Sequence, residues 1–104
     1  MYKIALVCEN GASTGMVVRK MVSAAQSKGI EAEIAAYPFT QLENFIDDKD
    51  VILIGPQMAF KKDAAIKSFP QHAGKISTIA PMDFGMMNGA KILDDAIKIA
   101  ENNK

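Results

Sequence analysis

IALVCENGAST, residues 4–14, is the stretch that decides the fold, because it runs from an apolar strand through a short loop into a helix. The unbroken apolar run at 4–7 is typical of a strand covered on both faces, as in a parallel sheet. Ser13 or Thr14 can cap the helix that follows, in which apolar residues recur at helical spacing from Val17 to Ala25. Strand, loop and helix in this order begin a β-α-β unit.

The rest of the chain repeats this alternation of short apolar runs and segments of helical period. Lys28 and Gly29 end the first helix, with a cation in its last turn and a residue that tolerates left-handed dihedral angles. We predict further strands at 31–37, 51–54 and 75–79, and helices at 40–46, 58–69 and 92–100. The alternation predicts an α/β fold: a doubly wound, four-stranded parallel sheet in the order 2-1-3-4, with helices on both faces.

The composition fits one small domain that spans residues 1–104. Hydrophobic residues make up 49% of the chain, enough for a core, and the single cysteine excludes an internal disulfide framework. Basic and acidic residues number 12 each, a balance that argues against general binding of nucleic acid or anionic membranes. The apolar runs are too short to cross a membrane, and the N-terminus lacks the features of a signal peptide. We therefore expect a cytoplasmic monomer with no bound metal or cofactor.

The order of the predicted strands reverses between the first and the third, and ligands of such sheets bind at the carboxyl ends of those strands. The two ends are Cys8 and the segment 55–57, which reads Gly-Pro-Gln. The amide of Gln57 is therefore placed to hydrogen-bond the loop after Cys8 or a group bound there. Asp83 follows the fourth strand on the same edge, where it can act as a general acid or simply form a turn.

The loop after Cys8 has the composition of an anion-binding nest, in which backbone N–H groups turn inward in front of a helix N-terminus. Such dipoles favour a thiolate, so we expect a lowered pKa for this cysteine and a phosphoryl group carried on its sulfur. Cys8 is the predicted reacting residue, and the predicted phosphoryl-binding loop is Glu9, Asn10, Gly11, Ala12, Ser13 and Thr14. From spacing alone, a buried structural cysteine beside a capped helix explains the pattern equally well.

The loop lacks residues that nucleotide-binding P-loops, tyrosine phosphatases and thiol redox proteins need. No Gly-Lys-Ser/Thr closes the loop, as it does in a nucleotide-binding P-loop. A tyrosine-phosphatase loop has an arginine six residues after its cysteine; here that position is Thr14, and Arg19 lies about a turn and a half further along the helix. No second cysteine is present to resolve an oxidised thiol. A phosphocysteine here is expected to hydrolyse slowly, which suits a carrier.

Three motifs carry a resemblance to a known family. They are Cys8-x-x-Gly11-x-Ser13-Thr14 after the first strand, Leu53-Ile54-Gly55-Pro56-Gln57 at the end of the third, and Phe84-Gly85 with Asn88-Gly89 before the last helix. With these motifs the sequence resembles the cytoplasmic IIB component of the bacterial phosphoenolpyruvate-dependent sugar phosphotransferase system, in the lactose, cellobiose and chitobiose branch. The resemblance extends from Lys3 to about Ala100.

The resemblance implies a phosphoryl relay through Cys8. A phosphohistidine on a IIA protein donates to Cys8, and phospho-Cys8 donates to a sugar such as cellobiose, chitobiose or lactose, held in the membrane-embedded IIC permease. The chain departs from the family at Glu9, because members often have a small residue directly after the cysteine. The negative charge of a carboxylate there would repel both a thiolate and a phosphoryl group on Cys8. Alternatively, it would influence which partner protein binds.

Two alternatives and several further residues complete the sequence-based picture. The alternatives are an enzyme of the low-molecular-weight phosphatase or arsenate-reductase type and a non-catalytic anion-binding module. His72, the only histidine, is expected in a loop at the amino end of the strands, away from Cys8. Met82, Met86 and Met87 can form an adaptable docking patch, with core packing as the expected use of at least one of them.

Overall fold

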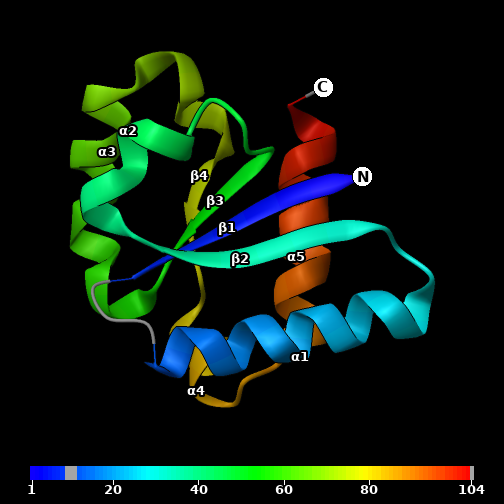
Figure 1. Cartoon of the computed structure of the whole chain (residues 1–104). Helices are drawn as coiled ribbons and strands as arrows, with labels where there is room; N and C mark the ends of the chain where they lie inside the picture. The colour runs from blue at the N-terminus through cyan, green and yellow to red at the C-terminus, as the bar shows by residue number, and fades with distance from the viewer. Residues whose placement is uncertain (9–11, 104) are drawn as a thin grey trace.

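The computed structural model describes residues 1–8 and 12–103 of the chain. Within these ranges, parallel strands form one four-stranded sheet in the order β2-β1-β3-β4, which confirms the predicted topology (Figure 1). The strands are β1 (Tyr2–Cys8), β2 (Ala32–Pro38), β3 (Val51–Ile54) and β4 (Ile76–Thr78). The predicted strand at 51–54 is confirmed to the residue, and the others differ by one or two residues at their ends.

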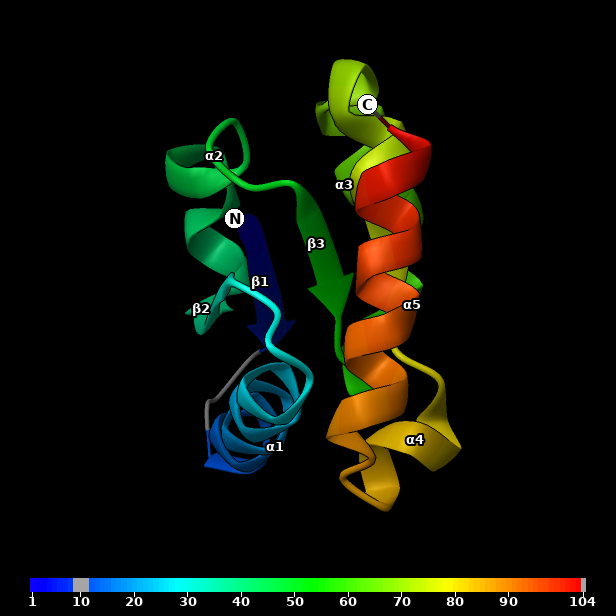
Figure 2. The same cartoon turned by 90° about the vertical axis from the view of Figure 1, so that its right-hand side faces the viewer.

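Helices cover both faces of the sheet, as the alternating sequence pattern predicts. Figures 1 and 2 show α1 and α5 on one face, and α2 and α3 on the other. None of the helices in the described ranges is both long enough and apolar enough to cross a bilayer. The α-helices are α1 (Ala12–Lys28), α2 (Leu42–Phe45), α3 (Lys62–Ser68), α4 (Pro81–Gly85) and α5 (Gly89–Asn102), and the 3₁₀ helices are η1 (Phe39–Gln41), η2 (Pro56–Lys61) and η3 (Pro70–Lys75).

Strand β1 lies between two hydrophobic clusters, one on each face of the sheet. Ile4 and Leu6 point into the cluster formed with α1 and α5, whereas Ala5 and Val7 point into the cluster formed with α2 and α3. All four side chains are fully buried, because successive residues of a strand face opposite sides. The unbroken apolar run of the sequence is therefore the signature of a central parallel strand.

The first helix begins earlier than the sequence predicts. Because α1 starts at Ala12, Ser13 and Thr14 stand inside its first turn, and the prediction that one of them precedes the helix as its cap is wrong. A run of adjacent small and polar residues offers several possible cap positions, and tertiary packing selects among them. Thr14 belongs to the buried stripe of the helix, which continues through Val17 and Met21.

The C-terminus of α1 agrees with the prediction. Gly29 adopts a left-handed backbone conformation with φ of +67°. The N–H of Ile30 donates to the carbonyl of Ala25 at 2.9 Å, and the N–H of Gly29 donates to that of Gln26 at 3.2 Å. These two bonds form a Schellman motif, which satisfies carbonyl groups that the helix leaves without partners.

Two segments between β3 and α5 differ from the prediction. The helix predicted at 58–69 begins at Pro56 as the 3₁₀ helix η2, and it becomes α-helical only at Lys62. Pro56 starts this segment at once after β3 because its fixed φ suits a first helical position, and Met58, with φ of −118°, interrupts regular α-helix. The segment around Asp83, where the sequence analysis predicted no helix and considered a turn, is the short helix α4, which also begins at a proline, Pro81.

The start of α5 packs directly on the backbone of α1. A Cβ atom built on Gly89 would lie 2.4 Å from the carbonyl carbon of Lys20 and 2.6 Å from the backbone nitrogen of Met21. The adjoining Asn88 accepts a hydrogen bond from the N–H of Lys91 at 3.2 Å and so caps the helix. The absence of a side chain at Gly89 is therefore what allows the two helices to approach so closely.

Candidate functional site

Cys8 is the last residue of β1 and lies where the order of the sheet reverses. Strand β2 is on one side of β1 and β3 on the other. Gly55, which follows β3, donates its N–H to the carbonyl of Val7 at 3.0 Å and thus holds the two strand ends together. The structure therefore brings Cys8 and the segment 55–57 to one place, as the sequence predicts.

The side chain of Cys8 is almost fully buried, with 8% of the residue exposed. By the alternation of the strand it belongs to the same face as Ile4 and Leu6, which is the face that α1 and α5 cover. Helix α1 begins only four residues later in the chain, at Ala12, so its N-terminus stands at the same edge of the sheet. The short connection therefore keeps the start of α1 close to the end of β1.

The N-terminus of α1 has the electrostatic character that an anion requires. The first N–H groups of a helix have no partner within the helix, and the helix dipole makes this end positive. No acidic side chain stands in the first turn of α1 to neutralise that end. Of the predicted phosphoryl-binding loop, Glu9, Asn10 and Gly11 lie outside the described residues, and the loop's role stays a prediction.

Gln57 lies at this edge as well. Its side chain is exposed, and its Oε1 atom bends back toward Gly55, where a Cβ atom built on the glycine would approach it to 3.1 Å. The same Cβ atom would lie 3.5 Å from the carbonyl oxygen of Val7. The amide thus reaches toward the end of β1. It also lines a hollow of about 250 Å³ whose other lining residues are Met16, Phe84, Gly85 and Met87.

Asp83 lies on the predicted edge, but its carboxylate belongs to a different group of side chains. Its Oδ2 atom lies 3.6 Å from Nζ of Lys91, which also donates to Asp95 at 2.7 Å. The hydrogen bond to Asp95, with Asp83 nearby, raises the pKa of the Lys91 ammonium. Asp83 lines a hollow between β4 and α5 that Gln57 does not line. Its proposed role as a general acid stays a prediction.

His72 lies at the opposite edge of the sheet, as the sequence predicts, although in the 3₁₀ helix η3 and not in a loop. Its Nε2 atom is 2.5 Å from Oδ1 of Asp47. Together with Asp47 it lines a pocket beside Tyr2, at the beginning of β1. The length of β1 therefore separates His72 from Cys8.

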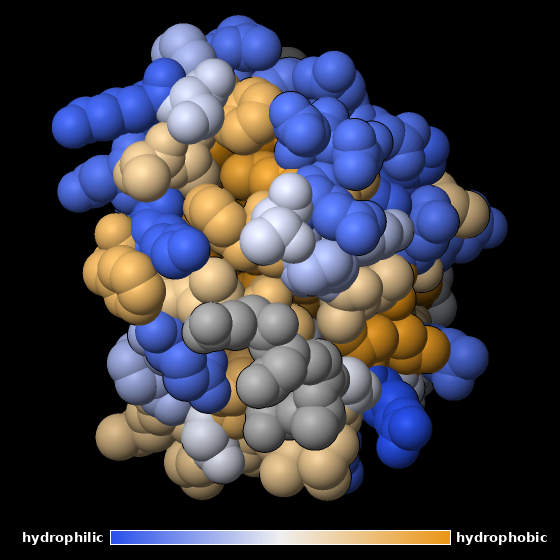
Figure 3. Space-filling model, turned by 60° about the vertical axis from the view of Figure 1, so that its left-hand side comes forward, coloured by the Kyte–Doolittle hydropathy of each residue, from blue (hydrophilic) through white to orange (hydrophobic). Residues whose placement is uncertain are grey.

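Of the large exposed apolar side chains among the described residues, all but Met1 belong to segments at the Cys8 edge. We call Met16, Phe60, Met82 and Met86 the edge patch; they are between 48% and 76% exposed. Met16 comes from the start of α1 and Phe60 from η2, whereas Met82 lies in α4 and Met86 directly follows it. Figure 3 shows apolar surface in both the upper and the lower half of that view, with hydrophilic side chains between. Met87 packs instead against the core beside α1 and α5, which confirms the expectation that one of the three methionines is used there.

The sequence analysis missed Met16 and Phe60, although a signal for Met16 was present. Helical spacing places Met16 off the buried stripe of Val17 and Met21, so an exposed methionine could have been read from the pattern. The exposure of Phe60 depends on the 3₁₀ geometry of η2, which the sequence analysis did not predict.

Comparisons with known proteins agree with this geometry. Residues 3–95 match the family described as the lactose/cellobiose-specific IIB subunit of the phosphotransferase system. The chain is 38% identical to the oligo-β-mannoside-specific EIIB component of Bacillus subtilis over 98% of this chain and 99% of that protein. It is 37% identical to the galactose-specific EIIB component of Lactococcus lactis over 86% of this chain and 88% of that protein.

A solved structure shows the same relationship. The solution structure of the cellobiose-specific IIB component from Borrelia burgdorferi superposes with a TM-score of 0.82 at 38% identity, covering 97% of this chain and 93% of that one. Fold, strand order and sequence thus agree over nearly the whole chain. The chain belongs to the lactose/cellobiose-specific IIB family of the phosphotransferase system, and as such it is a phosphotransferase component that takes part in the phosphoryl relay of sugar uptake.

Proposed function

We propose that Cys8 is the residue on which the phosphoryl group travels. In the first step the Cys8 sulfur, as the thiolate, attacks the phosphorus of a phosphohistidine on the IIA protein, the P–N bond breaks, and the histidine nitrogen keeps the electron pair. In the second step a hydroxyl oxygen of the sugar attacks, the P–S bond breaks, and the hydroxyl proton leaves to water or a neighbouring base. The observation that carries the proposal is the position of Cys8 at the reversal of the sheet, beside the N-terminus of α1.

The surroundings of Cys8 supply positioning and charge stabilisation. We assign the phosphoryl oxygens to the backbone N–H groups at the start of α1 and to the loop 9–14, with Ser13 and Thr14 as further donors. Gln57 is proposed to orient the loop or the phosphoryl group through its amide, which already reaches toward the end of β1. Asp83 is proposed to support the site indirectly, by holding α4 to α5 through Lys91.

The partners follow from the family. IIB components work with IIA and IIC components of the sugar phosphotransferase system. We propose a IIA phosphohistidine as donor, a IIC permease as the holder of the sugar, and residues 1–104 as one cytoplasmic carrier unit. The relatives are named for oligo-β-mannoside and for galactose, and the related solved structure for cellobiose. On that basis we propose a β-linked disaccharide as the acceptor.

The relay is tested by phosphorylation and peptide mapping. The chain is mixed with phosphoenolpyruvate and the upstream relay proteins, and its mass is expected to rise by one phosphoryl group carried on the peptide that contains Cys8. Adding membranes that contain the IIC partner and a panel of disaccharides is then expected to discharge the phosphoryl group onto one class of sugar. An unchanged mass, or a phosphoryl group that maps to His72, would exclude Cys8 as the carrier.

The edge patch is proposed to dock the partner proteins around Cys8. Met86→Glu is expected to raise the apparent KM for the phosphorylated IIA protein about tenfold, because an apolar side chain of this size contributes about 1.5–3 kcal/mol when buried. Thermal stability is expected to stay unchanged, since Met86 is 74% exposed. Gln26→Glu, which adds the same charge to an exposed position near the far end of α1, is the control. An equal KM for both variants would show that the patch is not used for docking.

A further inference from the structure

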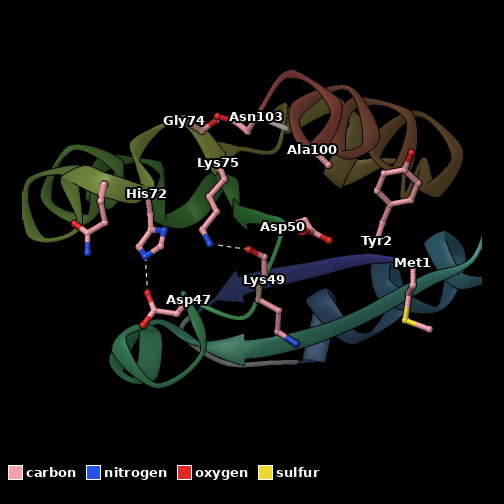
Figure 4. Close-up of a pocket in the computed structure, with 11 residues that line it drawn as sticks. Met1, Tyr2, Asp47, Lys49, Asp50, His72, Gly74, Lys75, Ala100 and Asn103 are labelled. Atoms are coloured by element: carbon pink, nitrogen blue, oxygen red, sulfur yellow. Dashed lines mark hydrogen bonds and ion pairs between the residues drawn. The ribbon is translucent and has the colours of Figure 1, made fainter.

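A second pocket lies at the amino end of the sheet, at the edge opposite Cys8. We call it the amino-edge pocket; its volume is about 560 Å³, within the range of about 300–1,000 Å³ usual for small-molecule sites. Figure 4 shows that its walls come from the start of β1, the segment between α2 and β3, the helix η3, and the end of α5. The polar residues that line it and that a ligand could contact are Tyr2, Asp47, Asp50, Gln71, Lys75 and Asn103.

Lys75 provides a fixed cationic donor in this pocket. Its Nζ atom donates to the backbone carbonyl of Lys49 at 2.7 Å, which holds the ammonium in the position that Figure 4 shows. Burial lowers the pKa of Lys75, although Asp47, Asp50 and Asp48 attract the charged form. The ammonium carries three protons, so two remain for a ligand. The fixed position of the ammonium means that a ligand would meet a donor already held in place.

The carboxylates of the pocket are held by other groups of the protein. Asp47 contacts His72 at 2.5 Å, and Oδ2 of Asp50 accepts the backbone N–H of Lys3 at 2.8 Å. Both carboxylates keep lone pairs that can accept from a hydroxyl group. Both carboxylates line the same pocket as the ammonium of Lys75, whereas the ammonium of the other lining lysine, Lys49, lies over the ring of Tyr37, 4.9 Å from its centre. An anionic ligand is therefore repelled by the carboxylates and a cationic ligand by the ammonium of Lys75.

Neutral polar groups complete the lining. The amide of Asn103 donates to the carbonyl of Gly74 at 2.8 Å, which fixes its oxygen beside the glycine. Tyr2 presents a ring in the wall, and its hydroxyl is hydrogen-bonded to Glu101. Donors, acceptors, charges of both signs and one aromatic ring match the surface of a sugar, which offers hydroxyl groups at its edges and C–H groups on its faces.

We propose that the amino-edge pocket binds a neutral polyhydroxy compound of mono- to disaccharide size. The site is separate from Cys8, since the two lie at opposite ends of β1, and it goes beyond the phosphoryl relay. Lys75, Asp47 and Asp50 act as the main hydrogen-bonding groups, and the ring of Tyr2 faces the C–H groups of the ligand.

An NMR titration of the full chain with cellobiose and with glucose tests the proposal. The backbone amide signals of residues 47–50 and 71–75 are expected to shift with saturation at millimolar sugar, while signals near Cys8 stay in place. Lys75→Met, which keeps an unbranched chain one atom shorter, is expected to weaken the affinity about tenfold, because a hydrogen bond from a charged donor is lost. Lys67→Met, at an exposed position of α3 outside the pocket, is the control and is expected to bind as the unchanged chain does.

A second variant tests the same pocket if Lys75→Met does not fold. Gln71→Ala removes an exposed amide from the pocket rim and is also expected to weaken binding. The proposal is overturned if neither sugar gives saturable shifts at residues 47–50 and 71–75, or if inorganic phosphate or glucose 6-phosphate binds there more tightly than the neutral sugars. Phosphorylation of Cys8 is measured on the same samples, so a failure of sugar binding and a failure of the relay are seen independently.

Discussion

Replacing Cys8 by serine is expected to lower phosphoryl uptake from the phosphorylated IIA protein by at least about 1,000-fold, equivalent to about 4 kcal/mol of transition-state stabilisation. A thiol is partly ionised near neutral pH and its thiolate is a strong nucleophile, whereas a serine hydroxyl without an adjacent base stays protonated. The measurement is the rate at which the mass increase of one phosphoryl group appears. The effect is the largest that we expect from a single change, because it removes the attacking atom.

The fold is expected to tolerate this substitution. Serine is close to cysteine in size, and residue 8 stands at the end of β1, where 8% of it is exposed. Circular dichroism and thermal unfolding of the variant therefore report whether a loss of uptake is chemical in origin. Uptake at an undiminished rate in a folded Cys8→Ser protein would falsify the assignment of the sulfur as carrier and leave an anion-binding role for the site.

Gly89→Ala is expected to destabilise the protein by about 3 kcal/mol, the upper part of the range usual for overpacking a core. The new methyl group would sit 2.4 Å from the carbonyl carbon of Lys20. Backbone cannot rotate out of the way as a flexible side chain can, so α1 and α5 must move apart. For a protein of this size, the melting temperature is expected to fall by about 10–20 °C.

A matched glycine provides the control for this prediction. Gly15 lies in α1, and a Cβ atom added there meets nothing within 4 Å. Gly15→Ala is therefore expected to leave stability unchanged or to raise it by up to about 1 kcal/mol, since alanine favours the helix. Thermal unfolding of both variants distinguishes a steric effect from a general effect of removing glycine. Equal melting temperatures for the two would mean that α1 and α5 do not pack as closely as described.

The arrangement of the sheet could be predicted because its signals are local. The apolar run at 51–54 is bounded by Asp50 and Gly55, and the structure places β3 at the same four residues. Alternation of strands and helices then leaves few topologies, and the right-handed crossover rule selects among them. Helix boundaries were predicted less well, because several neighbouring residues can begin a helix and packing decides which does, as at Ala12 and Pro56.

The position of the candidate site followed from topology, but its side-chain partners did not. Cys8 and Gln57 follow neighbouring strands, so the sequence was sufficient to place them at one edge. The ion pair of Asp83 with Lys91 depends on how α4 meets α5, and the sequence carries no local signal for that angle. The same holds for the amino-edge pocket, whose walls come from segments far apart in the chain.

Strand β1 is covered on both faces of the sheet, which affects how firmly Cys8 at its end is held. The strand that ends at the sulfur is clamped from both sides, with Ile4–Val7 wholly inside the protein, so local opening of this strand requires much of the core to come apart. The exposed apolar side chains of the edge patch are carried instead by short helices and by the first turns of α1. If Cys8 carries the phosphoryl group as proposed, the sulfur is thus attached to a deeply buried strand, while the exposed side chains proposed to meet the partner proteins belong to segments that can shift without moving β1.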